Sequence, residues 1–289
     1  MNVTFSDKDA LLNFTIAYFK LLPKASDTVG SGYWFIDPFG YILQNGKPVF
    51  VGVHYFFNHS EVAPIENLFL PLYEFAKSLN ASSIANITAP IPQARYVFPQ
   101  PGGHDPSCKN TVLVLGSRMD SRRNLLTPDG ASNLTNAIKQ ILTNFPIIIE
   151  GHLTAGGQVA RNANISSGLN PSWREALGQI IIPLGYDDNT AVAMQEQMMQ
   201  SLTNVQVPIL AAVDPSMGAY TNEADPNEGE WQSVFWGSNY ARLLEIKNRW
   251  DPRGVFRCNR CVGSEGWVEM GTVLRNLVKE RESKICLRV

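Results

Sequence analysis

The chain has 289 residues, of which 44% are hydrophobic, and a formal net charge of −2 at pH 7. Such a length can bury one large core or two moderate ones, so we expect a globular protein. The near-zero charge, with no basic run beyond Arg122-Arg123, argues against nucleic acid or a membrane surface as a partner. No apolar run approaches the roughly 20 residues that span a bilayer.

The first part of the chain is predicted to fold as helices packed on an antiparallel meander. Residues Ser6 to Leu22 carry an apolar stripe at helical spacing, with Ser6 as N-cap and Pro23 closing the helix. A second helix, Glu61–Leu79, is expected to kink at Pro71. Three strands are predicted from aromatic and β-branched runs separated by Asp-Pro and Asn-Gly turns: Gly32–Ile36, Tyr41–Leu43 and Pro48–Phe57.

The middle of the chain continues this architecture. Thr127 as N-cap and Pro128 at the first helical position open a helix that reaches about Phe145, and a methionine-rich helix covers Asn189–Leu202. Residues Pro90–Lys109 are expected to form a long loop. Further strands are predicted at Ser82–Thr88, Val112–Met119, Ile147–His152, Ala155–Ala160 and Ile180–Leu184. This order predicts an α+β fold with one antiparallel sheet and helices on one face, and no phosphate-binding loop occurs.

The last third holds most of the motifs. Tyr220 and Asn222 follow the short apolar run Val207–Val213, and side chains two apart share a face of an extended strand. A helix is predicted over Trp231–Trp250, with Ser233 as N-cap and Asp251-Pro252 ending it. From the residues alone, Tyr220 can equally be a tyrosine that forms a structural hydrogen bond near the end of a strand.

Cysteines and histidines give no metal-site pattern. The four cysteines are too few for a disulfide scaffold, and Cys258-Asn-Arg-Cys261 is a single CxxC without a second ligand pair. The four histidines show no metal spacing. We therefore expect no metal, and either a local disulfide or two free thiols at Cys258 and Cys261.

Glycosylation sequons are enriched. Seven asparagines start an Asn-x-Ser/Thr triplet, against about two or three expected by chance from the composition: Asn2, Asn13, Asn58, Asn80, Asn86, Asn133 and Asn164. The first residues lack a basic region and an apolar region, so no signal peptide starts here. We expect a glycoprotein of the secretory pathway or the extracellular space whose signal lies on a segment outside this chain, or an intracellular descendant of one.

The C-terminal motifs together closely resemble those of a known enzyme family. They run from Tyr220-x-Asn222 through Trp231-Gln232, Phe235-Trp236-Gly237, Asn239-Tyr240 and Asp251-Pro252 to Val262-Gly263-Ser264. The pattern resembles berberine-bridge-enzyme-like FAD-linked oxidases, of the vanillyl-alcohol-oxidase and p-cresol-methylhydroxylase type, and fungal members are most similar. Leu115-Gly116-Ser117-Arg118 and Asn170-Pro171-Ser172-Trp173-Arg174 are similar to motifs of that family's substrate domain, in the same order.

The resemblance implies about half of such an enzyme. Residues 1–213 would form the substrate domain, and residues 214–289 a C-terminal segment that packs on the flavin domain. On this resemblance the N-terminal FAD-binding domain would be absent from this chain, so FAD would be bound only if another chain supplies that domain. The expected partner is a flavin-domain polypeptide, giving a heterodimer, or a second copy, and the long loop would lie near a ligand entrance.

The resemblance also implies a chemistry and its residues. The function would be oxidation of a small molecule of secondary metabolism, with Tyr220 as the base and Asn222 contacting the flavin ring or holding Tyr220. Gln158, from the strand that crosses the family's pocket, would be a weaker candidate for substrate contact. Two alternatives stay open: a flavin-independent cyclase or isomerase that uses the same pocket, and a non-catalytic partner subunit.

Overall fold

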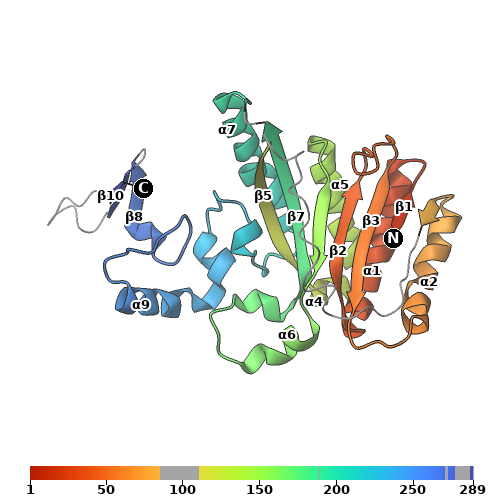
Figure 1. The fold of residues 1–289 in the computed structure, drawn as a ribbon, viewed down its shortest axis with the longest axis horizontal. Coiled ribbons are helices and arrows are strands. Elements are labelled where there is room, and N and C mark those ends of the chain that lie inside the picture. Colours follow the sequence, from red (N-terminus) through yellow and green to blue (C-terminus); the bar gives the residue numbers. More distant parts are fainter. Residues whose placement is uncertain (85–110, 188, 271–272, 277–286, 289) are drawn as a thin grey trace.

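The computed structural model describes residues 1–84, 111–187, 189–270, 273–276 and 287–288. In these residues one seven-stranded sheet runs in the order β4-β1-β3-β2-β6-β7-β5, and every paired neighbour is antiparallel (Figure 1). Its strands are β1 Asn2–Thr4, β2 Gly30–Asp37, β3 Val49–Phe56, β4 Ser82–Ile84, β5 Thr111–Ser121, β6 Ile149–Leu153 and β7 Ala176–Asp187. The longest strand pairing, β5 with β7, ends the sheet on one side.

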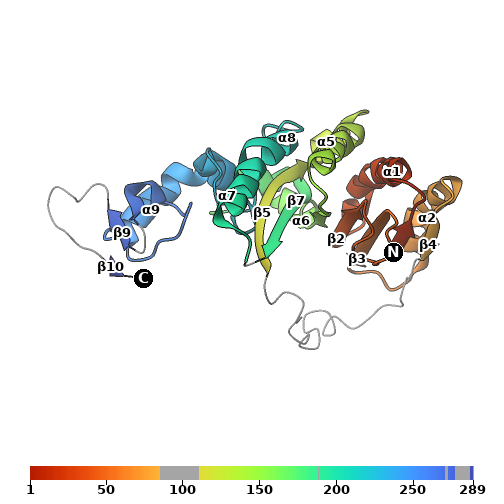
Figure 2. The same cartoon turned by 90° about the horizontal axis from the view of Figure 1, so that it is seen from above.

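One layer of helices covers one face of this sheet, as seen from above in Figure 2. The layer comprises α1 Lys8–Asp27, α2 Ala63–Ser78, α5 Gly130–Asn144, α7 Val192–Ser201 and α8 Val207–Ala211, with a π-helical turn, Leu202–Gln206, between the last two. The core lies between the layers, where Phe14 and Tyr18 of α1 pack on Trp34 and Phe50 of the strands. The predicted α+β class, with helices on one face, is confirmed.

Strand alternation defines the opposite face of the sheet. On β2, Trp34 and Ile36 are fully buried under the helices, whereas Tyr33, which precedes Trp34, is 45% exposed. Val53, the cross-strand partner of Tyr33 on β3, is also exposed. We call this the open face, because none of the helices of the layer covers it.

The remaining short elements lie at the ends of the sheet and beyond β5. They are α4 Arg122–Leu125, α6 Gly157–Arg161, η2 Asn162–Asn164, η3 Pro171–Arg174, η5 Thr221–Glu223, the π-helix η6 Gln232–Trp236, η7 Gly237–Asn239, α9 Tyr240–Trp250 and η8 Ser264–Gly266. A small sheet of β8 Trp267–Met270, β9 Val273–Asn276 and β10 Leu287–Arg288 follows. Figure 1 shows the C-terminal segment passing beside β5 and continuing outward to α9.

Several predicted boundaries in the N-terminal part are wrong. The N-cap of α1 is Asp7, whose carboxylate accepts the Ala10 N–H at 2.9 Å, rather than Ser6. Pro23 lies inside that helix, because its buried neighbours Leu22 and Ala25 continue the packed face and outweigh one lost backbone bond. Pro71 lies inside α2, and this part of the prediction is confirmed.

Two side chains explain further errors. Tyr41–Leu43 is a turn instead of a strand, because the buried Asp37 carboxylate accepts hydrogen bonds from the N–H groups of Phe39, Gly40 and Ile42. The hydroxyl of Thr127 donates to the Asn124 carbonyl at 2.7 Å, so it does not cap α5, which begins at Gly130.

The predicted strand Ala155–Ala160 is wrong, because the chain turns at Gly156 into α6. Gly156 has φ +78°, and a Cβ there would lie 2.3 Å from the Ser26 hydroxyl, so this close approach to α1 requires glycine. The run Val207–Val213 begins with a helix, because Val207 and Leu210 are both buried at helical spacing. Of the strand Ser82–Thr88, the structure describes Ser82–Ile84, and the loop Pro90–Lys109 lies outside the described residues.

The single helix predicted over Trp231–Trp250 is interrupted. Gly237 has φ +57° and packs against Pro171, which separates the π-helix η6 from α9. Ser233 therefore lies within η6 and caps nothing; its hydroxyl donates to the Glu230 carbonyl. The predicted end at Asp251 is confirmed.

Candidate functional site

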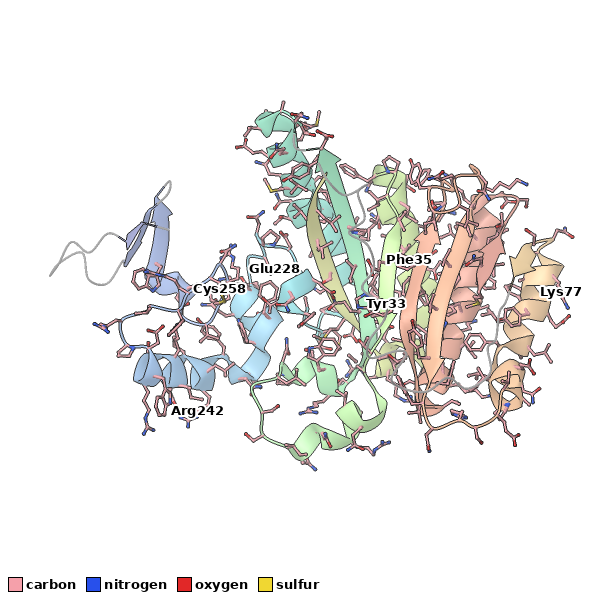
Figure 3. The ribbon with its side chains drawn as sticks, in the orientation of Figure 1. Tyr33, Phe35, Lys77, Glu228, Arg242 and Cys258 are labelled. Atoms are coloured by element: carbon pink, nitrogen blue, oxygen red, sulfur yellow. A yellow bond between two sulfur atoms is a disulfide. The ribbon has the colours of Figure 1, made fainter. Side chains whose placement is uncertain are left out.

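The candidate site begins with one row of residues across the open face. Cross-strand pairing joins Tyr33 of β2 to His152 of β6, His152 to Gln179 of β7, and Gln179 to Met119 of β5. Side chains of directly paired residues point to the same face of a sheet. This row therefore carries an imidazole and an amide on a surface that the helices leave bare, and Figure 3 labels Tyr33 on β2.

The C-terminal segment crosses this row at Gln179. The Met119 N–H of the edge strand donates to the Gly218 carbonyl at 2.9 Å. The Gln179 amide accepts the Tyr220 N–H at 3.1 Å and donates to the Glu223 carboxylate at 2.9 Å. Gln179 is 0% exposed, so this bridge is sealed beneath the segment. These hydrogen bonds of Gln179 fix the position of the Tyr220 backbone over the sheet.

Tyr220 and Asn222 meet at their side chains. They do not lie on a strand, because η5 is a 3-10 turn closed by the Glu223 N–H on the Tyr220 carbonyl at 2.9 Å. The Asn222 amide nevertheless donates to the Tyr220 phenol oxygen at 2.8 Å, and the ring of Trp173 stands edge-on at 5.9 Å. Tyr220 is 37% exposed. The pair thus offers an amide-held phenol that is accessible at the open face.

A His–carboxylate chain extends from Glu223. The Nδ1 of His152 lies 3.7 Å from the Glu223 carboxylate, and its Nε2 lies 3.1 Å from that of Glu150. The Tyr33 ring packs edge-on against His152 at 4.6 Å between ring centres. These contacts of His152 with two carboxylates were not predicted from the sequence, although Glu150 and His152 alternate with the apolar Ile149, Gly151 and Leu153 along β6. Polar residues at every second position of a buried strand are a signal that could have found it.

Gln158 does not join this cluster. It lies exposed on α6, where its amide donates to Asn162 at 2.7 Å and accepts from Arg161 at 3.0 Å. It is therefore not on a strand, and its side-chain hydrogen bonds in the described structure are with Asn162 and Arg161 rather than with Tyr220 or Gln179.

Buried charge holds the C-terminal segment against β5. Arg118 donates to Glu228 at 2.7 Å, and both side chains are almost fully buried; Glu228 is labelled beside β5 in Figure 3. At the end of the strand, Ser121 donates to Asp214 at 2.5 Å. Burial, together with the nearby Asp214 carboxylate, raises the pKa of Asp120 to about 8. Hydrogen bonds from Ser121 and Ser216, and Arg123, outweigh burial and lower the pKa of Asp214.

A cavity of about 340 Å³ lies between β5 and the C-terminal segment. Its lining includes Leu113 and Leu115 on one side, Asn222 and Ala224 on the other, and Asn259 and Arg260. Apolar walls with amide and guanidinium donors suit the edge of a planar heterocycle with carbonyl acceptors, such as the isoalloxazine ring of FAD. The residues around Asn222 therefore fit the ring end of that cofactor, whereas the sequence has no phosphate-binding loop for its other end.

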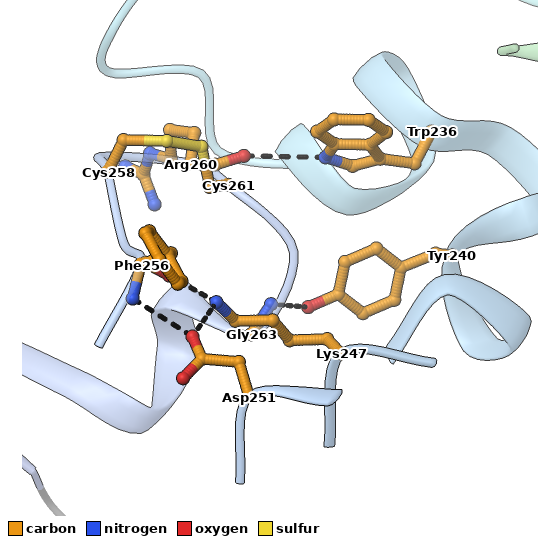
Figure 4. The surroundings of a disulfide bond; sticks show 9 residues. All are labelled: Trp236, Tyr240, Lys247, Asp251, Phe256, Cys258, Arg260, Cys261 and Gly263. Carbon is orange, nitrogen blue, oxygen red and sulfur yellow. Dashed lines mark hydrogen bonds and ion pairs between the residues drawn. A yellow bond between two sulfur atoms is a disulfide. The ribbon is translucent and has the colours of Figure 1, made fainter. Parts of the chain in front are cut away.

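Cys258 and Cys261 form a disulfide, which decides between the two predicted states (Figure 4). Among the described residues, no group of three His, Cys, Asp or Glu side chains could hold a metal ion. In the same part of the chain no helix is long and apolar enough to cross a membrane.

Comparison with known proteins places this site in a family. A family model described as "Berberine and berberine like" matches residues 219–263, from Ala219 just before the candidate pair to Gly263. An uncharacterized FAD-linked oxidoreductase of Arthroderma benhamiae is 42% identical over 259 residues, 86% of this chain and 43% of that protein. The FAD-linked oxidoreductase sor8 of Hypocrea jecorina is 30% identical over 93% of this chain and 44% of its own length.

Solved structures share the fold. The VAO-type flavoprotein MtVAO713 from Myceliophthora thermophila aligns with a TM-score of 0.75 at 23% identity, over 93% of this chain and 48% of that one. GilR, an oxidoreductase that catalyzes the terminal step of gilvocarcin biosynthesis, aligns with a TM-score of 0.64 at 16% identity, over 91% and 55%. The chain thus spans about half the length of the curated relatives it matches. It belongs to the berberine-bridge-enzyme-like family of FAD-linked oxidoreductases.

Proposed function

We propose that this chain is the substrate-domain half of an FAD-linked oxidase that acts on a small molecule of secondary metabolism. The observation that carries the proposal is the Tyr220–Asn222 pair, held by the buried Gln179 over an open sheet face. Residues 1–213 would form the substrate domain, and residues 214–289 the segment that packs on the flavin domain. One structural neighbour, GilR, acts in gilvocarcin biosynthesis, which supports the choice of substrate class.

In this proposal each residue has a distinct role. As its phenolate, Tyr220 would accept the substrate proton, because the side chain is accessible and its oxygen already accepts the Asn222 amide, a bond that would stabilise the negative charge. Asn222 holds that oxygen and, from the cavity wall, contacts the edge of the flavin ring. When bound, FAD supplies the hydride acceptor. Gln158 stays the weaker candidate for substrate contact.

The open face would form the substrate wall. Tyr33 and Trp173 offer aromatic surface, and Glu150 and His152 offer polar groups on β6. An aromatic wall with a few convergent polar groups is typical of small-molecule sites.

The flavin domain would come from a further polypeptide, or a second copy would cover the same surface. Trp250 is 77% exposed and Phe256 79% exposed, and contiguous apolar surface usually marks an interface. We expect a complex that buries more than roughly 1,000 Å². Light scattering tests this, and a stable monodisperse monomer counts against it.

We also propose that the protein is a glycoprotein of an oxidising compartment. Five sequon asparagines, Asn13, Asn58, Asn80, Asn133 and Asn164, are exposed. The Cys258–Cys261 disulfide fits the secretory pathway, where such bonds persist. Mass spectrometry of protein from the producing cells, with and without enzymatic deglycosylation, checks it; absence of glycan at all five refutes it.

Tyr220→Phe in the flavin-loaded enzyme tests the catalytic role. The substitution deletes one hydroxyl, and loss of a general base commonly costs about 10² to 10⁴ in rate, so kcat should fall in that range. Tyr41→Phe is the matched control, since Tyr41 is 54% exposed in the turn between β2 and β3. If Tyr220→Phe turns over like the control, Tyr220 is a structural hydrogen bonder only.

A further inference from the structure

The disulfide loop, residues 255–263, is hydrogen-bonded at both ends to residues of α9 and its C-cap. At its start, the Asp251 carboxylate accepts the N–H groups of Val255 at 2.8 Å and Phe256 at 2.9 Å. At its end, the Tyr240 phenol oxygen accepts the Gly263 N–H at 3.2 Å. Figure 4 shows both attachments below the disulfide. Tyr240 and Asp251, at the two ends of α9, therefore fix the start and the end of the loop.

Further hydrogen bonds and an ion pair support these attachments. Lys247 donates to the Asp251 carboxylate and to the Phe256 carbonyl, and the Tyr240 hydroxyl donates to Glu265 at 2.6 Å. The Lys247 hydrogen bond contributes most to lowering the pKa of Asp251 to about 2. Burial and the Glu265 carboxylate raise the pKa of Tyr240 to about 12. Asp251 thus stays ionised and Tyr240 protonated through the neutral pH range.

The tip of the loop touches the segment that carries the candidate pair. The Asn259 amide donates to the Pro226 carbonyl at 3.1 Å, and Arg260 Nε donates to the same carbonyl at 3.3 Å. The Arg260 carbonyl accepts the Trp236 indole N–H at 3.3 Å. Asn259 and Arg260 are the two residues enclosed by the disulfide, and Arg260 has φ +57°. The covalent ring closed by Cys258 and Cys261 can hold the backbone of Arg260 in this uncommon conformation.

We propose that the Cys258–Cys261 ring is a positioning clamp for the Tyr220–Asn222 pair, with Asn259 and Arg260 as positioning residues. Their hydrogen bonds to the Pro226 carbonyl restrain residues 221–226 at a second point besides the Gln179 contacts, and both residues line the same cavity as Asn222. In this proposal Gln179 fixes the backbone position of Tyr220, whereas the clamp fixes the distance of Asn222 from the sheet. The proposal rests on the proposed catalytic role of that pair.

The effect should appear in turnover rather than in binding. A displacement of about 1 Å at a reacting group can cost on the order of 10²-fold in rate. The open-face residues that would bind substrate, such as Tyr33 and His152, lie on β2 and β6, and their contacts in the described structure include each other, Glu150 and Glu223. Loosening the clamp should therefore lower kcat about 10- to 100-fold and change KM less than about threefold.

The test uses two variants of the flavin-loaded enzyme. Cys258→Ser/Cys261→Ser opens the ring, and Asn259→Ala/Arg260→Ala removes the tip donors while keeping the disulfide. Cys108→Ser/Cys286→Ser controls for the loss of two cysteines, and Arg253→Ala, at an exposed arginine just before the loop, controls for the loss of one guanidinium. Each variant is assayed for kcat, KM and bound flavin, and for hydrogen exchange in peptides covering residues 218–228.

The proposal expects both test variants to exchange faster in residues 221–228 and to lose kcat, with β2 and β3 unchanged and both controls like wild type. Unchanged exchange at 221–228 in both test variants overturns the clamp. Faster exchange with normal kcat overturns the positioning role. If exchange rises while Tyr220→Phe keeps full activity, the clamp stands and the proposed role of Tyr220 fails, so the two failures are distinguishable.

Discussion

Gln179→Leu should destabilise the protein although the two side chains are similar in size. The substitution removes the acceptor of the Tyr220 N–H and the donor to Glu223. A buried N–H left unpaired costs about 1–3 kcal/mol. The Glu223 side chain is 31% exposed and can turn to water, which limits its loss to about 1 kcal/mol. Leucine regains about 1 kcal/mol through apolar burial, so the net loss is about 1–3 kcal/mol.

Thermal melts measure this loss. At about 2–4 °C per kcal/mol for a chain of this size, Tm should fall by roughly 2–12 °C. Gln158→Leu is the matched control, because Gln158 is exposed and bonded only within its own helical segment; surface changes of this kind stay within about 0.5 kcal/mol. Equal Tm changes for the two variants would refute the buried bridge.

Three further outcomes are expected. Because the pKa of Asp120 is raised to about 8, the folded chain retains a proton that the unfolded chain releases, and stability falls as pH rises from about 4 to 8. Asp120→Asn should flatten that slope in melts between pH 5 and 8.5, and an unchanged slope contradicts the assignment. The pKa of Asp251 is lowered to about 2, so its stabilisation is present above about pH 4 and disappears toward pH 2; Asp251→Asn should speed hydrogen exchange at Val255 and Phe256 at pH 7, and slow exchange there argues against the anchor. Asn222→Ala should hardly move the Tm of the isolated chain but should reduce flavin retention in the complex, whereas equal losses with and without flavin would leave Asn222 a turn residue.

Sequence periodicity predicted the architecture because the fold is built from local patterns. The apolar stripes of α1, α2 and α5 and the alternation on β2 each bury one side of an element, and such patterns need no knowledge of distant residues. Errors arose where a distant atom decides the local structure. The chain turns at Gly156, where the backbone lies close to Ser26. The helix predicted over Trp231–Trp250 is interrupted at Gly237, which packs against Pro171.

The candidate site shows the same division. Tyr220, Asn222 and the end of α9 at Asp251 could be identified from motifs within a few residues of one another. Gln179 could not, because its role depends on a hydrogen bond to a residue 41 positions later. The His152 contact with Glu223 likewise exists only through the register of β6 and β7 and the path of the C-terminal segment.

The position of β1 has a consequence for the order of events during synthesis. Val3 pairs with Phe50 on one side and with Ser83 on the other, so neither neighbour exists when Val3 leaves the ribosome. At about 5–20 residues per second, the strand waits on the order of 4–16 s for β4 to be made. Until then the sequon at Asn2 is an unfolded peptide, whereas afterwards it is a half-buried inner strand. A sugar at Asn2 would have to be attached in that interval, while Asn133, exposed on α5, stays within reach of the transferase after folding.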